Sequence, residues 1–132
     1  MKRRNFIALT TLGAAAVSIP FLNCGTTTTA LEKKLALPQA LSRITDENSI
    51  IAIGKAYGNI HAEEYAVKML EQQLQKNSQG ALVADNTAEK DIDTFLEKNI
   101  YNDLDHGNTI VLNGWVLSIT EARQCALFSL TR

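Results

Sequence analysis

One dipeptide near the C-terminus, Asn113-Gly114, constrains the fold more than any other feature of the sequence. It stands between two short apolar runs, Thr109–Leu112 and Trp115–Leu117. Asn-Gly in this setting is the strongest short-range signal for a β-hairpin, because both residues accept the positive φ that a type I′ turn requires. A two-stranded hairpin alone is marginally stable in water. The sequence therefore predicts one hairpin that packs against helices.

A final helix is expected to begin directly after the second strand. Ser118 and Glu121 have the spacing of a capping box, in which the first side chain caps the helix and the second bonds back to the cap. The helix should run from Ile119 to about Leu130. Its small and apolar side chains would be buried against the hairpin: Ala122, Cys125, Ala126 and Phe128.

Upstream of the hairpin, apolar residues recur at intervals of three and four, which indicates helices that bury one face. The predicted helices are a short one that opens at Pro38, then 47–57, 62–76 and 88–104, with N-terminal caps at Thr45-Asp46-Glu47 and Asn86-Thr87 and stops at Gly58-Asn59 and Asp105-His106-Gly107. The expected class is mainly α. It is a small bundle of about four to five helices with one C-terminal β-hairpin, preceded by an N-terminal signal helix.

One glycine and one charged pair inside these helices lead to further predictions. Gly54 costs a helix about 1 kcal/mol relative to Ala, so its presence indicates close packing against a neighbour. Glu64 and Lys68 stand four residues apart, where they would pair along one helix face. A loop is expected at Asn77-Ser78-Gln79-Gly80.

Composition limits the class of protein. The chain has 132 residues, of which 45% are hydrophobic, a value typical of a globular domain with one modest core. Its formal net charge is −1, and without the basic residues Lys2, Arg3 and Arg4 it becomes −4. A mildly acidic domain argues against nucleic acid as a partner, since phosphate binding needs a basic face.

The first residues have the layout of an export signal. Lys2-Arg3-Arg4 is followed by an uncharged run, Phe6–Ile19, which Pro20 ends. About 14 residues is too short for a helix that spans a bilayer core and fits the apolar region of a signal peptide. Arg3-Arg4 followed by Phe6-Ile7 resembles a twin-arginine signal, which implies export by the twin-arginine translocation machinery. The other interpretation, an amphipathic or buried helix, is weaker because the run is apolar on all sides.

Cys24 raises the question of membrane attachment. Leu22-Asn23-Cys24 resembles a lipobox, although Phe21 and Asn23 depart from the usual pattern. Lipidated Cys24 would hold the protein at the membrane, with 25–34 as a polar tether. Cleavage nearby, after Ala30 for example, and an uncleaved signal anchor are the alternatives. The predicted domains are a signal at 1–24, the tether at 25–34 and one globular domain at 35–132.

Three segments together resemble a known kind of protein. These are Asn113-Gly114-Trp115-Val116-Leu117-Ser118-x-Thr120-Glu121-Ala122-Arg123, the segment Ile53–Tyr57 and the twin-arginine leader. In this combination the chain is similar to small exported bacterial proteins of unknown function. The leader alone also resembles that of small accessory subunits of membrane-bound flavin dehydrogenases, such as the gluconate dehydrogenase small subunit. That second resemblance implies a companion oxidoreductase.

The candidate metal ligands are few. His61 and Glu64, three residues apart, would share a helix face. The set lacks a Cys pair and a His-x-x-x-His motif, so it is poor evidence for a metal site. The other interpretation places His61 at a helix start and His106 at a helix C-terminus, where a cation is favourable. We expect no metal and no cofactor.

Two residues are candidates for an interface, Trp115 and Arg123. Trp115 is either an exposed anchor for a partner or part of the core. Arg123 is either an interface residue or a solvated side chain. Cys125 would be a lone thiol after processing, and its neighbours favour a small buried hydrophobe over a reactive site.

These observations favour a non-enzymatic protein, since the sequence holds no catalytic constellation. The expected function is that of an exported accessory or small subunit that accompanies a cofactor-containing oxidoreductase at the cell envelope. The expected partners are that oxidoreductase subunit, the translocation machinery and the membrane. The alternative is a free-standing envelope lipoprotein that acts as a ligand-binding or structural module.

Overall fold

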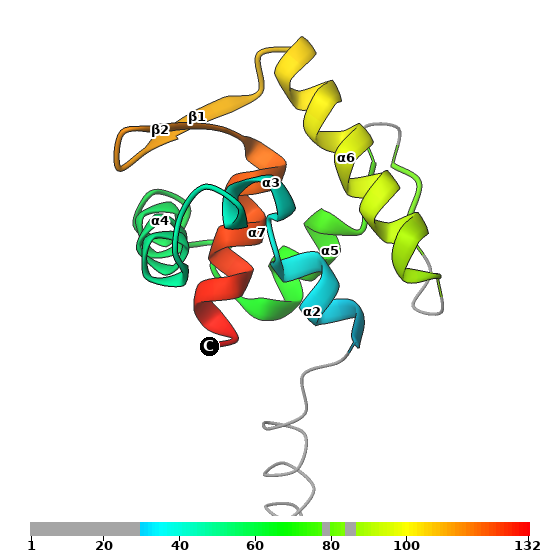
Figure 1. Ribbon diagram of the computed structural model, residues 1–132, viewed down its shortest axis with the longest axis horizontal. Helices are drawn as coiled ribbons and strands as arrows, with labels where there is room; N and C mark the ends of the chain where they lie inside the picture. The colour runs from blue at the N-terminus through cyan, green and yellow to red at the C-terminus, as the bar shows by residue number, and fades with distance from the viewer. Residues whose placement is uncertain (1–29, 78–79, 84–86) are drawn as a thin grey trace, which may run out of the picture.

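The computed structural model describes residues 30–77, 80–83 and 87–132 (Figure 1). Within these residues the chain forms six helices and a two-stranded antiparallel hairpin, which confirms the mainly α class with a C-terminal hairpin. The elements are α2 (Ala30–Ala36), α3 (Gln39–Ser42), α4 (Glu47–Ile60), α5 (Val67–Leu74), α6 (Glu89–Asp105), β1 (Thr109–Leu112), β2 (Trp115–Ser118) and α7 (Ile119–Leu130). The predicted signal at 1–24 lies outside the described residues.

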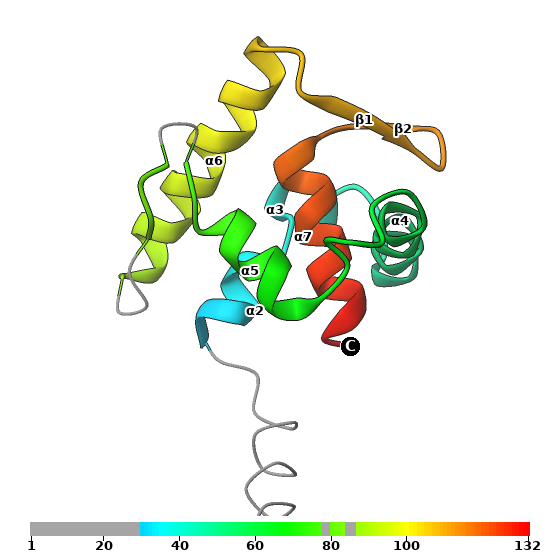
Figure 2. The ribbon, with the colours of Figure 1, turned by 180° about the vertical axis from the view of Figure 1, so that it is seen from behind.

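The C-terminal helix α7 lies at the centre of the fold. It packs against α4, α5, α2 and α6, as the two opposite views show (Figures 1 and 2). Its buried residues cover more than one face: Ala122, Gln124, Cys125, Ala126, Leu127 and Phe128. Because helices surround α7, its small and apolar side chains form the middle of the core.

Helix α4 crosses α7 at very close range. A Cβ atom placed on Gly54 would lie 2.2 Å from the backbone oxygen of Cys125, so only glycine fits there. This confirms the close packing expected at Gly54. Asp46 caps α4 by accepting from the Ser49 N–H at 3.0 Å, as predicted.

The predicted stop of α4 at Gly58-Asn59 is wrong, since the helix continues to Ile60. Gly58 is not a terminator. A Cβ atom there would lie 2.6 Å from the ring of Tyr65, so the glycine makes room for a side chain from the next segment. Packing thus explains this glycine, and turn geometry does not.

Helix α5 begins at Val67, five residues later than the predicted start at Ala62. Residues 61–66 form turns instead, and long-range contacts hold them: the Tyr65 hydroxyl lies 2.8 Å from Ser129 Oγ. The expected pairing of Glu64 with Lys68 along a helix is therefore wrong. Glu64 lies before α5 and pairs with Arg123 of α7.

The chain before α4 is more ordered than expected. Helix α2 covers residues 30–36 and therefore occupies part of the predicted tether at 25–34; Leu35 and Ala36 are buried. The rest of that tether lies outside the described residues. Pro38 forms the N-cap of α3, close to the expected short helix.

Helix α6 differs from prediction mainly at its start. Its N-cap is Ala88, which makes no side-chain hydrogen bond, so the predicted cap at Thr87 is wrong, and Asn86 lies outside the described residues. The C-terminal end is tied to α7, where Asp103 accepts from the Thr120 N–H at 2.9 Å and from its hydroxyl at 2.6 Å. These two buried bonds connect the end of α6 to the start of α7.

The hairpin has the predicted turn. Asn113 and Gly114 have φ values of 49° and 83°, and Leu112 pairs with Trp115 across the turn. Ser118 then forms the predicted capping box with Glu121, and α7 has the predicted bounds. The inward side chains of the hairpin, including Leu112 and Leu117, join the core.

Candidate functional site

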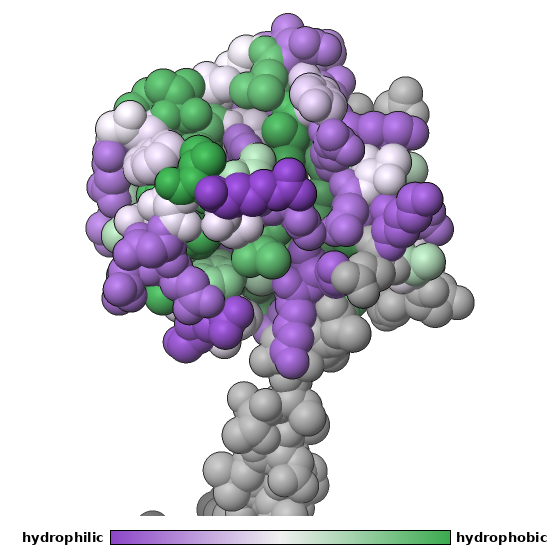
Figure 3. All heavy atoms as spheres, in the orientation of Figure 1, coloured by the Kyte–Doolittle hydropathy of each residue, from purple (hydrophilic) through white to green (hydrophobic). Residues whose placement is uncertain are grey.

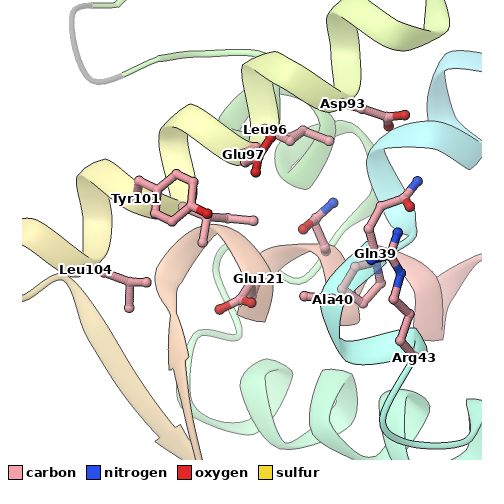
Figure 4. Close-up of a pocket in the computed structure, with 12 residues that line it drawn as sticks. Gln39, Ala40, Arg43, Asp93, Leu96, Glu97, Tyr101, Leu104 and Glu121 are labelled. Atoms are coloured by element: carbon pink, nitrogen blue, oxygen red, sulfur yellow. The ribbon is translucent and has the colours of Figure 1, made fainter.

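A groove of about 520 Å³ lies between α3, α6 and the beginning of α7 (Figure 4). We name it the α3–α6 groove. Its lining residues are Pro38, Gln39, Ala40, Arg43, Asp93, Leu96, Glu97, Ile100, Tyr101, Leu104, Glu121 and Gln124. Gln39, Ala40 and Arg43 lie on the α3 side, while α6 supplies the opposite wall.

The α6 wall is largely apolar. Leu96, Ile100, Tyr101 and Leu104 recur at intervals of one, three and four residues, which places them on one face of the helix. Leu96 is buried, whereas Tyr101 is 60% exposed and Leu104 is 48% exposed. In the space-filling view, apolar side chains gather over this part of the molecule with polar ones around them (Figure 3). The apolar face of this helix thus extends beyond the core into an accessible groove.

Acidic side chains dominate the charged part of the lining. Asp93, Glu97 and Glu121 contribute carboxylates, against the single guanidinium of Arg43 among the twelve lining residues. Glu121 is held in place because its Oε2 accepts from the Ser118 N–H at 3.0 Å. Asp93 Oδ2 lies 4.0 Å from Lys34 Nζ.

Two buried oxygen atoms of lining residues have no hydrogen-bond partner among the described residues: Gln124 Oε1 and Asp93 Oδ1. Gln124 is only 1% exposed, and its Nε2 donates to the carbonyls of Leu35 at 3.1 Å and Leu37 at 3.2 Å. Those two acceptors need a donor, so they fix the orientation of the amide. A buried acceptor without a partner costs about 1–3 kcal/mol, so a donor that reaches either oxygen would be favoured.

A second polar cluster joins α4, the 61–66 turns and α7. Tyr57 donates its hydroxyl hydrogen to Glu64, and Arg123 donates to the same carboxylate from Nη2 at 3.2 Å. Burial, together with the Glu64 bond, raises the pKa of Tyr57 to about 12. Burial alone would raise the pKa of Glu64, but the hydrogen bonds from Tyr57 and Arg123 outweigh it and lower that pKa. The cluster binds three segments of the fold together.

The structure places the two predicted interface residues away from the groove. Arg123 is paired with Glu64, and its side chain is 22% exposed. Trp115 is partly buried and packs against the core. Of the residues singled out for export and lipidation, Arg3, Arg4, Phe6 and Cys24 lie outside the described residues.

The remaining candidates are one cysteine and two histidines. Cys125 is a free, fully buried thiol, as expected, and burial, with a smaller contribution from the Glu121 charge, raises its pKa to about 12. His61 ends α4, so the predicted helix start is wrong, and its Nδ1 lies 3.5 Å from Glu63. His106 ends α6 as predicted. The described part of the chain contains no group of three His, Cys, Asp or Glu residues placed to hold a metal.

Sequence reasoning did not identify the α3–α6 groove. One signal was present: Gln124 is an uncharged polar residue inside the most buried stretch of α7. A buried amide needs partners from elsewhere in the fold, so it marks a place where segments meet. The groove itself depends on how α3 and α6 are placed relative to each other, and no local sequence pattern predicts that arrangement.

In the described residues, no helix has the length and apolar character that crossing a membrane requires. Comparison of the chain with protein-family models, curated proteins and solved structures found no match.

Proposed function

We propose that this chain is an exported, non-catalytic envelope protein that binds a small ligand in the α3–α6 groove. The observation that carries the proposal is a groove of about 520 Å³ with an apolar wall and two buried, unpartnered acceptors. Small-molecule sites in proteins are typically about 300–1,000 Å³, mostly apolar, with a few well-placed polar groups. The groove has this size and this composition.

Two ionisable groups of the interior are poor candidates for catalysis. Tyr57 and Cys125 have pKa values raised to about 12, so neither ionises near neutral pH. Catalytic acids, bases and nucleophiles usually have pKa values shifted toward the working pH. Both groups also lie in the interior, where they serve packing.

The leader supports export and attachment to the envelope. Arg3-Arg4 and the following apolar run resemble a twin-arginine signal, and Cys24 resembles a lipidation site. A ligand-binding domain held at a membrane by a lipid or by an uncleaved signal is consistent with both features.

A plug variant tests binding in the groove. Ala40 lines the groove and is exposed, so Ala40→Trp should fill the space without disturbing the core. Ala52 is exposed on α4 and lies outside the lining, so Ala52→Trp is the matched control. The probe is the neutral dye N-phenyl-1-naphthylamine, whose fluorescence increases in apolar sites, and circular dichroism verifies folding.

We expect saturable dye binding to the unmodified chain and to Ala52→Trp, and loss of that binding in Ala40→Trp. No binding to the unmodified chain would contradict the proposal. So would unchanged binding to Ala40→Trp, because the dye would then occupy another surface.

The leader favours a second function, that of an accessory subunit of an oxidoreductase. The twin-arginine route carries folded proteins, and a small domain has most reason to use it when it travels with a cofactor-loaded companion. A tagged chain purified from membranes should then carry a dehydrogenase with it. Recovery only as a free monomer would count against this role and leave ligand binding unaffected.

A further inference from the structure

We infer that the ligand of the α3–α6 groove is a cationic amphiphile, a protonated amine on an apolar body. This inference rests on the proposed function, because it names the chemical class that the groove would take. Three properties of the lining support it: the sign of its charge, the type of its unused hydrogen-bonding groups and the position of its apolar residues.

The charge of the lining favours a cation. Asp93, Glu97 and Glu121 exceed Arg43 by two negative charges within the lining. Glu97 is exposed, and Asp93 and Glu121 are partly buried, so their field reaches the groove from both α6 and α7. A cation gains from this field, whereas a ligand carboxylate would be repelled by it.

The lining residues also include two hydrogen-bond acceptors that lack a donor in the described part of the chain. Gln124 Oε1 and Asp93 Oδ1 have no partner within the described residues, and both residues line the groove. An ammonium group has three donors and no acceptor, so it complements these oxygens in a way that a carboxylate does not. A hydrogen bond to a charged donor is also stronger than one to a neutral donor.

The apolar part of the groove indicates that the ligand also has an apolar body. Leu96, Ile100 and Leu104 extend along α6 from the buried interior to the exposed end of the helix. The exposed ring of Tyr101 lies among them and has a face that attracts cations. An alkyl or aromatic body can lie along this wall while its ammonium group faces the carboxylates.

Three probes of equal chain length separate the possibilities: octylammonium, 1-octanol and octanoate at neutral pH. Each is titrated against the dye-loaded chain. We expect octylammonium to displace the dye at a concentration about tenfold lower than 1-octanol does, because its hydrogen bonds are charge-assisted. Octanoate should be the weakest.

Variants that remove carboxylates identify which residues cause octylammonium to displace the dye better than 1-octanol does. Asp93→Asn combined with Glu97→Gln should remove most of the tenfold advantage and leave 1-octanol unchanged. Because Asp93 also faces Lys34, Glu97→Gln alone is measured as well and should reduce the advantage in part. Asp91→Asn combined with Asp105→Asn changes the net charge equally on exposed positions of α6 outside the lining, and it should retain the advantage.

The outcomes distinguish the two proposals. Equal displacement by the three probes, or strongest displacement by octanoate, would overturn the ligand class and leave binding in the groove intact. Equal loss of the advantage in the control variant would also overturn it, since the effect would then come from net charge alone. Failure of the dye itself to bind would remove the proposed function first.

Discussion

Gly54 shows how one residue sets the distance between two helices. A Cβ atom there would lie 2.2 Å from the backbone oxygen of Cys125, and a backbone atom cannot rotate away. Helix propensity alone predicts that Gly54→Ala stabilises the chain by about 1 kcal/mol. We predict the opposite sign, a loss of about 2–3 kcal/mol in the free energy of unfolding, measured by urea denaturation. A stabilised variant would contradict this packing.

Glu64 provides a residue-scale prediction on pH. Its pKa in the folded state is lowered from the ordinary value of 4.5. The stabilisation it contributes is therefore present above pH 4.5 and is lost as the pH falls through the lowered pKa of the folded state. Glu64→Gln should have a lower free energy of unfolding than the unmodified chain at pH 7. This difference in stability should become smaller below pH 4. The midpoints of urea denaturation at pH 7, 5 and 3 measure this difference. A difference that does not change with pH would contradict the coupling between Glu64 protonation and stability.

The residues also show what sequence can and cannot predict. The role of Gly54 was predictable because a glycine inside a helix has a known local cost. The role of Glu64 was not, because its partner Arg123 lies 59 residues away and a local pairing with Lys68 was available. Gln124 was missed for the same reason, since the carbonyls it binds belong to the distant residues Leu35 of α2 and Leu37 just after it.

At the scale of elements, the hairpin and α7 were predicted with their correct bounds. Their determinants are local: a turn dipeptide and a capping box within a few residues of each other. The start of α5 was not predictable, because packing of Tyr65 against Gly58 and its contact with Ser129 override the local helical pattern. Tertiary contacts thus decide where α5 begins.

The hairpin turn gives a prediction at this scale. Gly114 has a φ of 83°, a conformation that a β-branched residue adopts only with strain. Gly114→Val should therefore lower the free energy of unfolding by more than about 1 kcal/mol, measured by thermal denaturation. Asn113→Gly is the control and should change stability by less than about 0.5 kcal/mol, because glycine accepts positive φ readily. An unchanged melting temperature for Gly114→Val would exclude the type I′ turn.

At the scale of the molecule, α7 lies at the centre of the body, and we propose that the leader at 1–24 directs that body to the cell envelope. If Cys24 carries the lipid anchor, Cys24→Ala should move the protein from the membrane fraction to the soluble fraction of the envelope. Immunoblotting of the two fractions measures the shift. Full retention in the membrane would eliminate lipidation as the anchor and favour an uncleaved signal.

The α3–α6 groove also belongs to the whole molecule, because it exists only where α3, α6 and α7 meet. The apolar periodicity of residues 88–104 was interpreted from sequence as one helix face buried in the core. The arrangement of three helices, which periodicity does not report, leaves part of that face accessible. The site could therefore be found only once the fold was known.

The most direct test of this account is an NMR titration of the ¹⁵N-labelled chain with octylammonium. We predict saturable shifts of backbone amides that cluster on α3, on residues 93–104 of α6 and at the start of α7, with the exposed face of α4 unaffected. Shifts spread over the surface, confined to the hairpin, or absent would contradict binding of a cationic amphiphile in the α3–α6 groove.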